Sequence, residues 1–354
     1  MIRYKSWPYI LLSVVMLASA ILSVPLERSL ESGIHGTELP KETEKTESLK
    51  AESVSDGLLF ILNSDGRSYT VSDIGTCTDT EVFIPNTYQG LPVTGIGDAA
   101  FSDCRDLKSI HIPQSVTDIG TLTFSGCVDL TQIELPNHLL SIPYGTFANC
   151  ANLTDIKIPS AVKSIDECAF IGCSSLKSIK IPKGAISIGA SAFQDCTALE
   201  YVDLSDSITS IGDRAFESCT NLTRIMIPSR VTSLGDRSFF GCTSLRDITL
   251  SSSMTSIGAS TFEGCENLTS IYIPYSVTSI GKGAFCACTN LKSVTLPHSL
   301  SLIDHDAFRS CTRLNSIHFD GTTAEWDAVE IYLGWSYNVP ASSVQCTDGA
   351  VRIR

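Results

Sequence analysis

The stretch FSDCRDLKSIHIPQSVTDIGTLTF, residues 101 to 124, contains one full copy of a motif that recurs every 23 residues. In each copy a phenylalanine is followed three residues later by a cysteine and three residues after that by a leucine. The ten phenylalanines are Phe101, Phe124, Phe147, Phe170, Phe193, Phe216, Phe239, Phe262, Phe285 and Phe308. Self-similarity at a fixed short period is typical of a solenoid, in which each coil packs only on its neighbours. The sequence therefore predicts one elongated repeat domain.

Each copy contains the pattern of one short strand. In the first copy Ile110 and Ile112 alternate with Ser109 and His111. We therefore expect the isoleucines to face the core and the two polar residues to face outward. Stacked copies would form a parallel sheet, and Pro113 would end it because proline has no N–H to donate to a ladder.

The remainder of the copy predicts two changes of direction. Val116 and Ile119 return the chain to the core, and we interpret Gly120 as a turn position with a positive φ, which glycine adopts readily. Phe101 and Cys104 have the i, i+3 spacing that places two side chains on one face of a short helical turn. The predicted fold class is an α/β repeat solenoid, with short parallel strands, short helical turns and a cap at each end.

Written as a consensus, the copies read A-F-x-x-C-x-x-L-x-x-I-x-I-P-x-x-V-T-x-I-G, which resembles the BspA-like class of leucine-rich repeats over about residues 101–319. The resemblance implies a curved solenoid without catalysis and, in several members, adhesion to host extracellular-matrix proteins or to other cells. Ser205, Ser251 and Asp320 stand where this pattern usually has proline, so we expect altered strand ends there but the same fold.

Five segments are predicted along the chain. They are a signal peptide at 1–20, a polar flexible linker at 21–56, an N-terminal cap with a partial repeat at 57–100, ten leucine-rich repeats at 101–319 and a C-terminal cap at 320–354. The signal peptide is indicated by Arg3 and Lys5, an apolar run from Ile10 to Leu17, and the triplet Ala18-Ser19-Ala20. The C-terminal cap is predicted to contain a short helix with Trp326 inward and a hairpin at Asp348-Gly349.

Charge and motifs argue against several functions. The net charge is −13, and no basic stripe of the kind that binds nucleic acid is visible. The sequence has no H-E-x-x-H, no G-x-S-x-G and no glycine-rich phosphate loop. We therefore predict no enzymatic activity, no cofactor and no metal site. His298 and His318 could approach each other on the outward face, although unpartnered surface histidines are the commoner case.

The fourteen cysteines suggest either disulfides or a buried ladder. Ten of them share one repeat position, where neighbours would lie about 5 Å apart with parallel side-chain directions, a poor geometry for a disulfide. We interpret these ten as buried free thiols that pack as small hydrophobic groups. The remaining four, Cys77, Cys168, Cys286 and Cys346, are the candidates for any disulfide that forms.

A binding site is expected on the concave sheet face, because solenoid curvature creates an extended surface there. Core positions are nearly identical between copies whereas outward positions vary, and several outward residues are of types that dominate interface energies. The candidate partner-binding residues are Tyr201, Asp203, Arg224, Met226, Tyr272, Tyr275, His298 and His318. Scattered surface aromatics without a partner are the alternative.

The function predicted is an exported, non-catalytic module for protein binding or adhesion, with an extracellular-matrix or cell-surface protein as its partner. It would be secreted or held at the cell surface after signal-peptide cleavage, with no transmembrane span in the mature chain. The alternatives are a glycan-binding module and a passive spacer of the same architecture.

Overall fold

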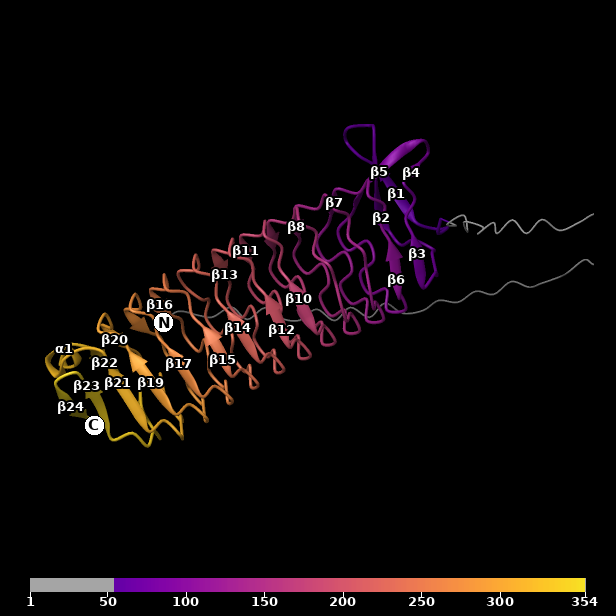
Figure 1. The fold of residues 1–354 in the computed structure, drawn as a ribbon. Helices are drawn as coiled ribbons and strands as arrows, with labels where there is room; N and C mark the ends of the chain where they lie inside the picture. Colours follow the sequence, from indigo (N-terminus) through magenta and orange to yellow (C-terminus); the bar gives the residue numbers. More distant parts are fainter. Residues whose placement is uncertain (1–53, 354) are drawn as a thin grey trace, which may run out of the picture. The chain divides into compact units, whose positions relative to one another are not determined.

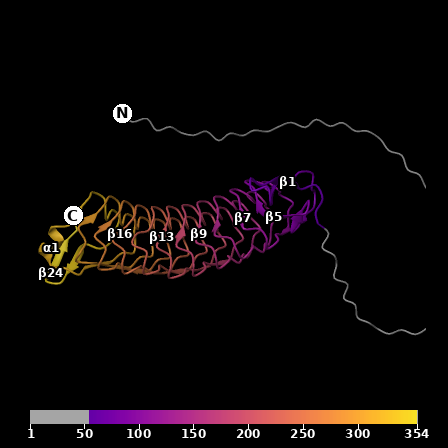
Figure 2. The ribbon, with the colours of Figure 1, turned by 90° about the horizontal axis from the view of Figure 1, so that it is seen from above.

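The computed structural model describes residues 54–353, which form one stack of coils (Figures 1 and 2). The predicted signal peptide and the predicted linker up to residue 53 lie outside the described residues. Ser55, at the end of the predicted linker, is buried and donates a 2.6 Å hydrogen bond from its Oγ to Asp79. The coils are numbered from Phe101, where coil one begins, and each later coil begins at the next phenylalanine of the series.

One side of the stack carries the longer strands, which we call the front ladder (Figure 1). Its strands are parallel, with an offset of one repeat, as in the pairing of Ser178 with Tyr201. In coil one Ile110 and Ile112 are buried while His111 is exposed, which confirms the predicted alternation. The front strands are β6 Ser109–His111, β10 Ser178–Lys180, β12 Tyr201–Asp203, β14 Arg224–Met226, β15 Asp247–Thr249, β17 Ser270–Tyr272, β19 Ser293–Leu296 and β21 Ser316–Phe319.

A second, narrower row of parallel strands, the back ladder, runs along another side of the coils (Figure 1). Each of its members has two residues, because the inward isoleucine is followed at once by the next turn. They are β7 Asp118–Ile119, β8 Ser141–Ile142, β9 Ser164–Ile165, β11 Ser187–Ile188, β13 Ser210–Ile211, β16 Ser256–Ile257, β18 Ser279–Ile280, β20 Leu302–Ile303 and β22 Glu330–Ile331.

The third side of each coil contains the Phe–Cys segment, and the helical turn predicted there is not confirmed. Ala99 and Asp103 have positive φ values of 52° and 58°, and the same two rows are left-handed in every coil. Left-handed residues interrupt a right-handed helix. The N–H groups of Ala99, Phe101 and Asp103 instead donate, at 2.6–2.9 Å, to carbonyls 22 residues further along the chain, on the neighbouring turn of the solenoid. Backbone hydrogen bonds therefore join successive coils on this side as well.

The structure also corrects the reason given for the glycine row. Gly120 has no positive φ, and neither has Gly212 or Gly235. A Cβ at Gly120 would lie 2.4 Å from the backbone nitrogen of Asp98, and one at Gly235 would lie 2.3 Å from that of Asp213. At these two glycines the backbone of the adjacent turn comes too close for a side chain, whereas Pro143, Asp166 and Asp304 occupy the same row in other coils.

The ten phenylalanines form one internal column, as the period predicts. All ten rings are fully buried, and successive ring centroids lie 5.1–5.7 Å apart with interplanar angles of 1–18°. Such offset stacks add a favourable aromatic term to the burial of each ring. The column continues the hydrophobic core from one end of the repeats to the other.

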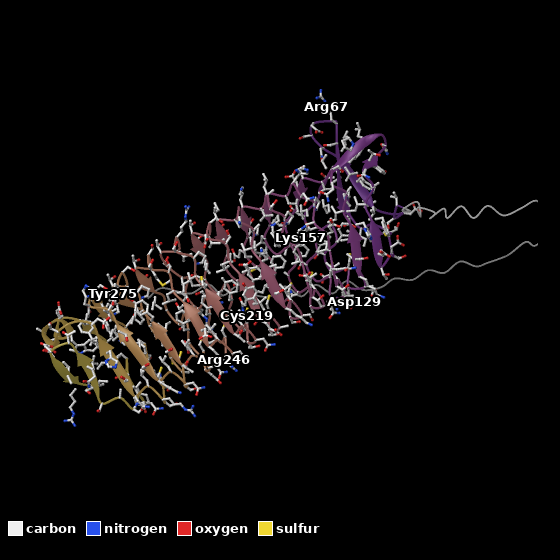
Figure 3. The ribbon with its side chains drawn as sticks, in the orientation of Figure 1. Arg67, Asp129, Lys157, Cys219, Arg246 and Tyr275 are labelled. Carbon is white, nitrogen blue, oxygen red and sulfur yellow. The ribbon has the colours of Figure 1, made fainter. Side chains whose placement is uncertain are left out.

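The cysteine column confirms the expectation of free thiols and adds a role. All fourteen cysteines, which lie within the described residues, are free, and nine of the ten at the repeat position, from Cys127 to Cys311, are buried, whereas Cys104 at the end of the ladder is only partly buried. Each of these nine donates its S–H to the carbonyl of a phenylalanine in the preceding coil, at 3.0–3.3 Å. Figure 3 shows Cys219 among the interior side chains of the stack. The thiol is therefore both a packing group and a weak hydrogen-bond donor.

The N-terminal region departs from the repeat. Its strands are β1 Leu59–Leu62, β2 Tyr69–Asp73, β3 Glu81–Phe83, β4 Thr87–Tyr88 and β5 Leu91–Ile96. β1 and β2 form an antiparallel hairpin, and β2 then pairs in parallel with β5, which continues into the back ladder through β7. The residues inserted before the first full copy form a second hairpin, β4–β5, with a turn at Gln89-Gly90.

The C-terminal region contains the predicted helix and hairpin. They are α1 Thr323–Asp327, followed after β22 by β23 Ser343–Cys346 and β24 Gly349–Arg352. Thr322 and Glu325 form a reciprocal capping box at the start of α1, which satisfies otherwise free N–H groups. Trp326 is buried, and its ring lies 5.2 Å from that of Phe319 and 6.0 Å from that of Trp335.

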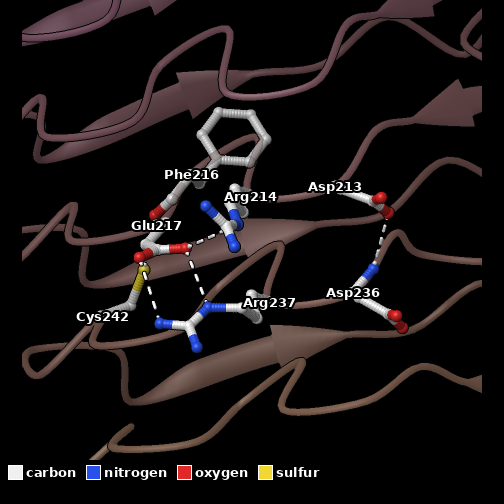
Figure 4. Close-up of polar contacts among 7 residues, drawn as sticks. All are labelled: Asp213, Arg214, Phe216, Glu217, Asp236, Arg237 and Cys242. Atoms are coloured by element: carbon white, nitrogen blue, oxygen red, sulfur yellow. Dashed lines mark hydrogen bonds and ion pairs between the residues drawn. The ribbon is translucent and has the colours of Figure 1, made fainter. Parts of the chain in front are cut away.

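Charged contacts also join neighbouring coils near their turns (Figure 4). Glu217, which is 9% exposed, accepts hydrogen bonds from the Arg237 guanidinium at 3.2 and 3.3 Å. Arg237 stands at the end of coil six and also lies over the ring of Phe240 in coil seven, 3.9 Å from its centroid. Asp213 accepts the N–H of Asp236 at 2.9 Å. These contacts fix the spacing of coils five to seven without using any outward side chain of the front ladder.

Candidate interaction surface

The candidate residues on the front ladder are positioned by the alternation of its strands. Every second residue of a strand faces outward, so one repeat row gives Asp203, Met226, Tyr272 and His318. Tyr201 and Arg224 stand two residues earlier in their strands and face the same way. Tyr275 and His298 follow the strand-ending prolines, at the corner beside the ladder.

The structure brings four of the candidates together on β12 and β14. Tyr201 pairs with Arg224 in register, and the guanidinium carbon of Arg224 lies 5.7 Å from the centre of the Tyr201 ring. Met226 is 69% exposed beside them, and Asp203 forms an ion pair with Lys180 at 3.4 Å. We call Tyr201, Asp203, Arg224 and Met226 the arginine–tyrosine cluster.

Three other candidates form a second group on coils eight and nine. The rings of Tyr272 and Tyr275 are 6.0 Å apart and nearly perpendicular, and the ring of His298 lies 6.1 Å from that of Tyr275. Tyr272 and Tyr275 are 55% and 57% exposed. Desolvation and the neighbouring Tyr275 phenol raise the pKa of the Tyr272 phenol. We call these three residues the tyrosine–histidine cluster, and Tyr275 marks it in Figure 3.

His318 joins neither cluster. Its Nε2 is 2.8 Å from the Oγ of Ser316 on the same strand, whereas His298 contacts Tyr275. No contact joins the two histidines among the described residues. The sequence placed both on adjacent coils, but His318 lies on the ladder and His298 on the corner row, which separates them.

One part of the front face was not identified from the sequence. A hollow of ≈ 460 Å³ lies on coils two to four, and its lining includes Asn137, Ile156, Lys157, Lys180, Pro182 and Lys183. The recurrence of lysine at the same row in coils three and four was the available signal. It was missed because the whole chain is acidic and two lysines in one row do not make a long basic stripe.

Within the described range 54–353, no three histidine, cysteine or carboxylate side chains are grouped closely enough to hold a metal ion. The same residues contain no helix that is long and apolar enough to span a membrane, since α1 has five residues.

Comparison with protein-family models finds a match to the BspA type Leucine rich repeat region, in six copies, over residues 94–223 and 209–328. No curated protein matches the chain.

Several solved structures are similar to the chain. A leucine rich cell surface protein from Faecalibacterium prausnitzii shares 27% identity over 78% of this chain and 97% of that chain, with a TM-score of 0.45. A leucine-rich repeat protein from Bacteroides ovatus shares 27% identity over 81% and 99% of the two chains, with a TM-score of 0.46. The pneumococcal vaccine antigen PcpA shares 17% identity over 82% and 98%, with a TM-score of 0.46.

Proposed function

Because the chain belongs to the BspA-type leucine-rich repeat family, we propose that it is a non-catalytic module that binds a protein partner through the front ladder. The observation that supports the proposal is the exposure of large side chains there. Met226 and Tyr272 are 69% and 55% exposed, whereas the same row carries threonine in coils seven and nine. Large exposed side chains next to small polar ones form a surface with distinct anchoring points.

The two clusters have the properties of interface anchors. Tyrosine, methionine and arginine are enriched in protein–protein interfaces, and a few such residues supply most of the binding energy. The cation–π contact of Arg224 with Tyr201 and the perpendicular packing of Tyr272 on Tyr275 restrain these side chains before any partner binds. Restraint lowers the entropy cost of association. The clusters are therefore prepared to bind with little rearrangement.

We further propose that both end regions act as caps. A solenoid needs atypical terminal units because its first and last coils would otherwise expose apolar surface. At one end the hairpin β1–β2 pairs with the back ladder through β5. At the other end the ring of Trp335 lies 6.1 Å from that of Phe308, and Trp326 packs on Phe319. These contacts support the domain boundaries proposed at residues 57, 101 and 320.

The partner class proposed is an extracellular-matrix or cell-surface protein, and the location proposed is outside the cell. The support is the signal-peptide pattern of residues 1–20 together with the family. The absence of a catalytic constellation in the described part of the chain is consistent with a binding role. Its His–carboxylate pairs, His111 with Glu81 and His305 with Asp304, are exposed, and no hydroxyl or thiol nucleophile is hydrogen-bonded to either.

The proposal is tested by measuring saturable binding of the immobilised protein to panels of matrix proteins and cell-surface proteins. For each panel protein that binds the wild-type solenoid, we expect the variant Y272A/Y275A or the variant Y201A/R224A to weaken binding at least about tenfold. Hot-spot residues contribute about 2 kcal/mol or more each. The matched control is T255A/T278A, two exposed residues that directly precede the back-ladder strands β16 and β18, and it should bind as wild type does.

Three results would contradict the proposal. Equal binding by all four proteins would exclude the front ladder as the binding face. Binding to neutral glycans in preference to every protein on the panels would favour the glycan-binding alternative. No saturable binding to any protein or glycan would favour the passive spacer.

A further inference from the structure

We propose that the hollow on coils two to four binds an acidic sugar unit, a sugar ring that carries a carboxylate or a sulfate group. The hollow has a volume of ≈ 460 Å³, within the range of about 300–1,000 Å³ found for small-ligand sites. It lies at the corner where the front ladder ends at Pro159 and Pro182. This inference does not depend on the protein-binding proposal, which concerns coils five to nine.

The rim of the hollow is cationic. Lys157 and Lys180 occupy the same row on adjacent coils, and Lys183 follows Lys180 across the proline corner. All three side chains belong to exposed residues, so their ammonium groups can move to meet a ligand. Lysine presents three rotatable donors on a flexible stem, which suits a tetrahedral sulfate as well as a planar carboxylate. In Figure 3, Lys157 lies well apart from Tyr275 along the stack.

Local charge differs from that of the whole chain. Five lysines and three carboxylates lie between residues 155 and 183, whereas the full sequence has a net charge of −13. Lys180 forms an ion pair with Asp203 at 3.4 Å, and Glu134 occupies the same row on the other flank. Within the described residues neither Lys157 nor Lys183 has a carboxylate within 4.0 Å. Two of the three rim charges are therefore available to an anion.

The backbone at the same place has unused polar groups. Of the ten coils in the described region, only coil three has neither a strand nor a bridge at the front-ladder rows. The N–H groups of Ile156, Lys157 and Ile158 make no backbone hydrogen bond to a neighbouring coil, in contrast to the 2.9 Å bond from Ile181 to Asp203. The cationic rim and the interruption of the ladder therefore coincide on one coil.

The rest of the lining favours a compact ring over an acidic peptide. Ile156, Ile158, Pro159 and Pro182 are buried and form the floor of the hollow, so a sugar ring would meet a small apolar floor flanked by the methylene stems of the lysines. An extended peptide would bind best by adding a strand to an open sheet edge. Coil three is enclosed by coils on both sides, so it has no open edge. The lysines then select among sugars by charge.

The experiment measures binding of the protein to three oligosaccharides of matched length: a uronic-acid oligomer carrying only carboxylates, a sulfated oligomer and a neutral oligomer. We expect saturable binding of at least one acidic oligomer, which weakens as salt rises, and none of the neutral one. K157Q/K180Q/K183Q should weaken that binding by about tenfold to a hundredfold. The oligosaccharide that binds shows whether the hollow recognises a carboxylate or a sulfate group.

The matched control is K108Q/K282Q/K292Q, which removes the same charge from exposed lysines elsewhere on the solenoid. We expect it to bind within about threefold of wild type, since distant exposed charges are screened. Equal losses in both triple variants would overturn the proposal, because binding would then follow net charge alone. Stronger binding of poly-glutamate than of either acidic sugar would also overturn it. Y272A/Y275A should bind the sugar as wild type does, which separates this site from the protein-binding surface.

Discussion

Two sets of positions in the same coils differ completely in how much their residues vary. Phe216 and Cys219 belong to columns that are identical in all ten copies, whereas Tyr201 and Met226 have different residues in most other coils. Each inner side chain is enclosed by the coils before and after it, so its shape must match theirs. An outward side chain of the front ladder borders solvent. The interior therefore determines stability, and the outward rows are free to determine binding.

The largest effect expected from disturbing the interior comes from ionising the cysteine column. Burial raises the pKa of the Cys242 thiol to about 12, and it raises the pKa values of Cys219 and Cys265 well above the ordinary value. In the unfolded chain these thiols ionise near the ordinary value of 9.0, while in the folded chain they stay protonated. The free energy of unfolding is thus fully retained below pH 9 and is lost as pH rises through the folded pKa values.

Each buried thiol contributes a loss of about 1.4 kcal/mol per pH unit above 9. For the eight buried ladder thiols from Cys127 to Cys288, whose pKa values burial raises, this loss together exceeds the usual total stability of about 5–15 kcal/mol within one to two pH units. We therefore expect cooperative unfolding between about pH 9 and 11, which circular dichroism can measure. In C196A/C219A/C242A the free energy of unfolding should fall less steeply with pH. An unchanged slope would show that other groups cause the alkaline transition.

A smaller but sharper contrast separates two neighbouring phenylalanines. Phe239 is a member of the buried column, while Phe240 lies at the surface under Arg237. Phe239→Ala should lower the free energy of unfolding by about 3–5 kcal/mol because it leaves a cavity between two stacked rings. Phe240→Ala should lower it by about 1 kcal/mol, mainly through loss of the cation–π contact. Urea denaturation measures both, and similar losses would mean that the column has no special role.

The smallest expected effects distinguish two kinds of backbone position: the glycine row, where adjacent turns approach closely, and the left-handed rows. Gly235→Ala should destabilise the chain by about 1–3 kcal/mol, because its Cβ would meet the backbone of Asp213. Ser218→Gly should instead stabilise it by up to about 1 kcal/mol, because Ser218 has φ 60° and the next coil has glycine at the same row. Thermal unfolding of both variants provides the comparison. Stabilisation by Gly235→Ala would refute the close approach of the coils.

Much of the fold could be predicted because each coil obeys local rules. The alternation of Ile110 and Ile112 with outward residues, the phenylalanine column and the buried thiols all follow from period and pattern. The left-handed rows could not be predicted in this way. Their occupants include Leu122, Arg214 and Ala287, residue types that rarely adopt positive φ, so only the stacking of coils can impose it.

The candidate site was predictable only in outline. The sequence placed Tyr201 and Arg224 on adjacent strands, and their contact followed. It did not separate His318 from His298, because the side of the proline corner on which each lies depends on the turn. It also gave no indication that Lys157, Lys180 and Lys183 surround a hollow, since a hollow is a property of the space between coils.

By itself the sequence determined that the chain is a solenoid, which residues face its core and which vary on its outer surface, because a strict 23-residue period can bury its apolar residues only by stacking. The tertiary structure decided what the period cannot express. It made the glycine row a place of close backbone approach, turned the cysteines into donors to the preceding coil, and gathered outward residues into two clusters and a cationic hollow. These features depend on distances between successive coils, and such distances exist only after the coils have packed.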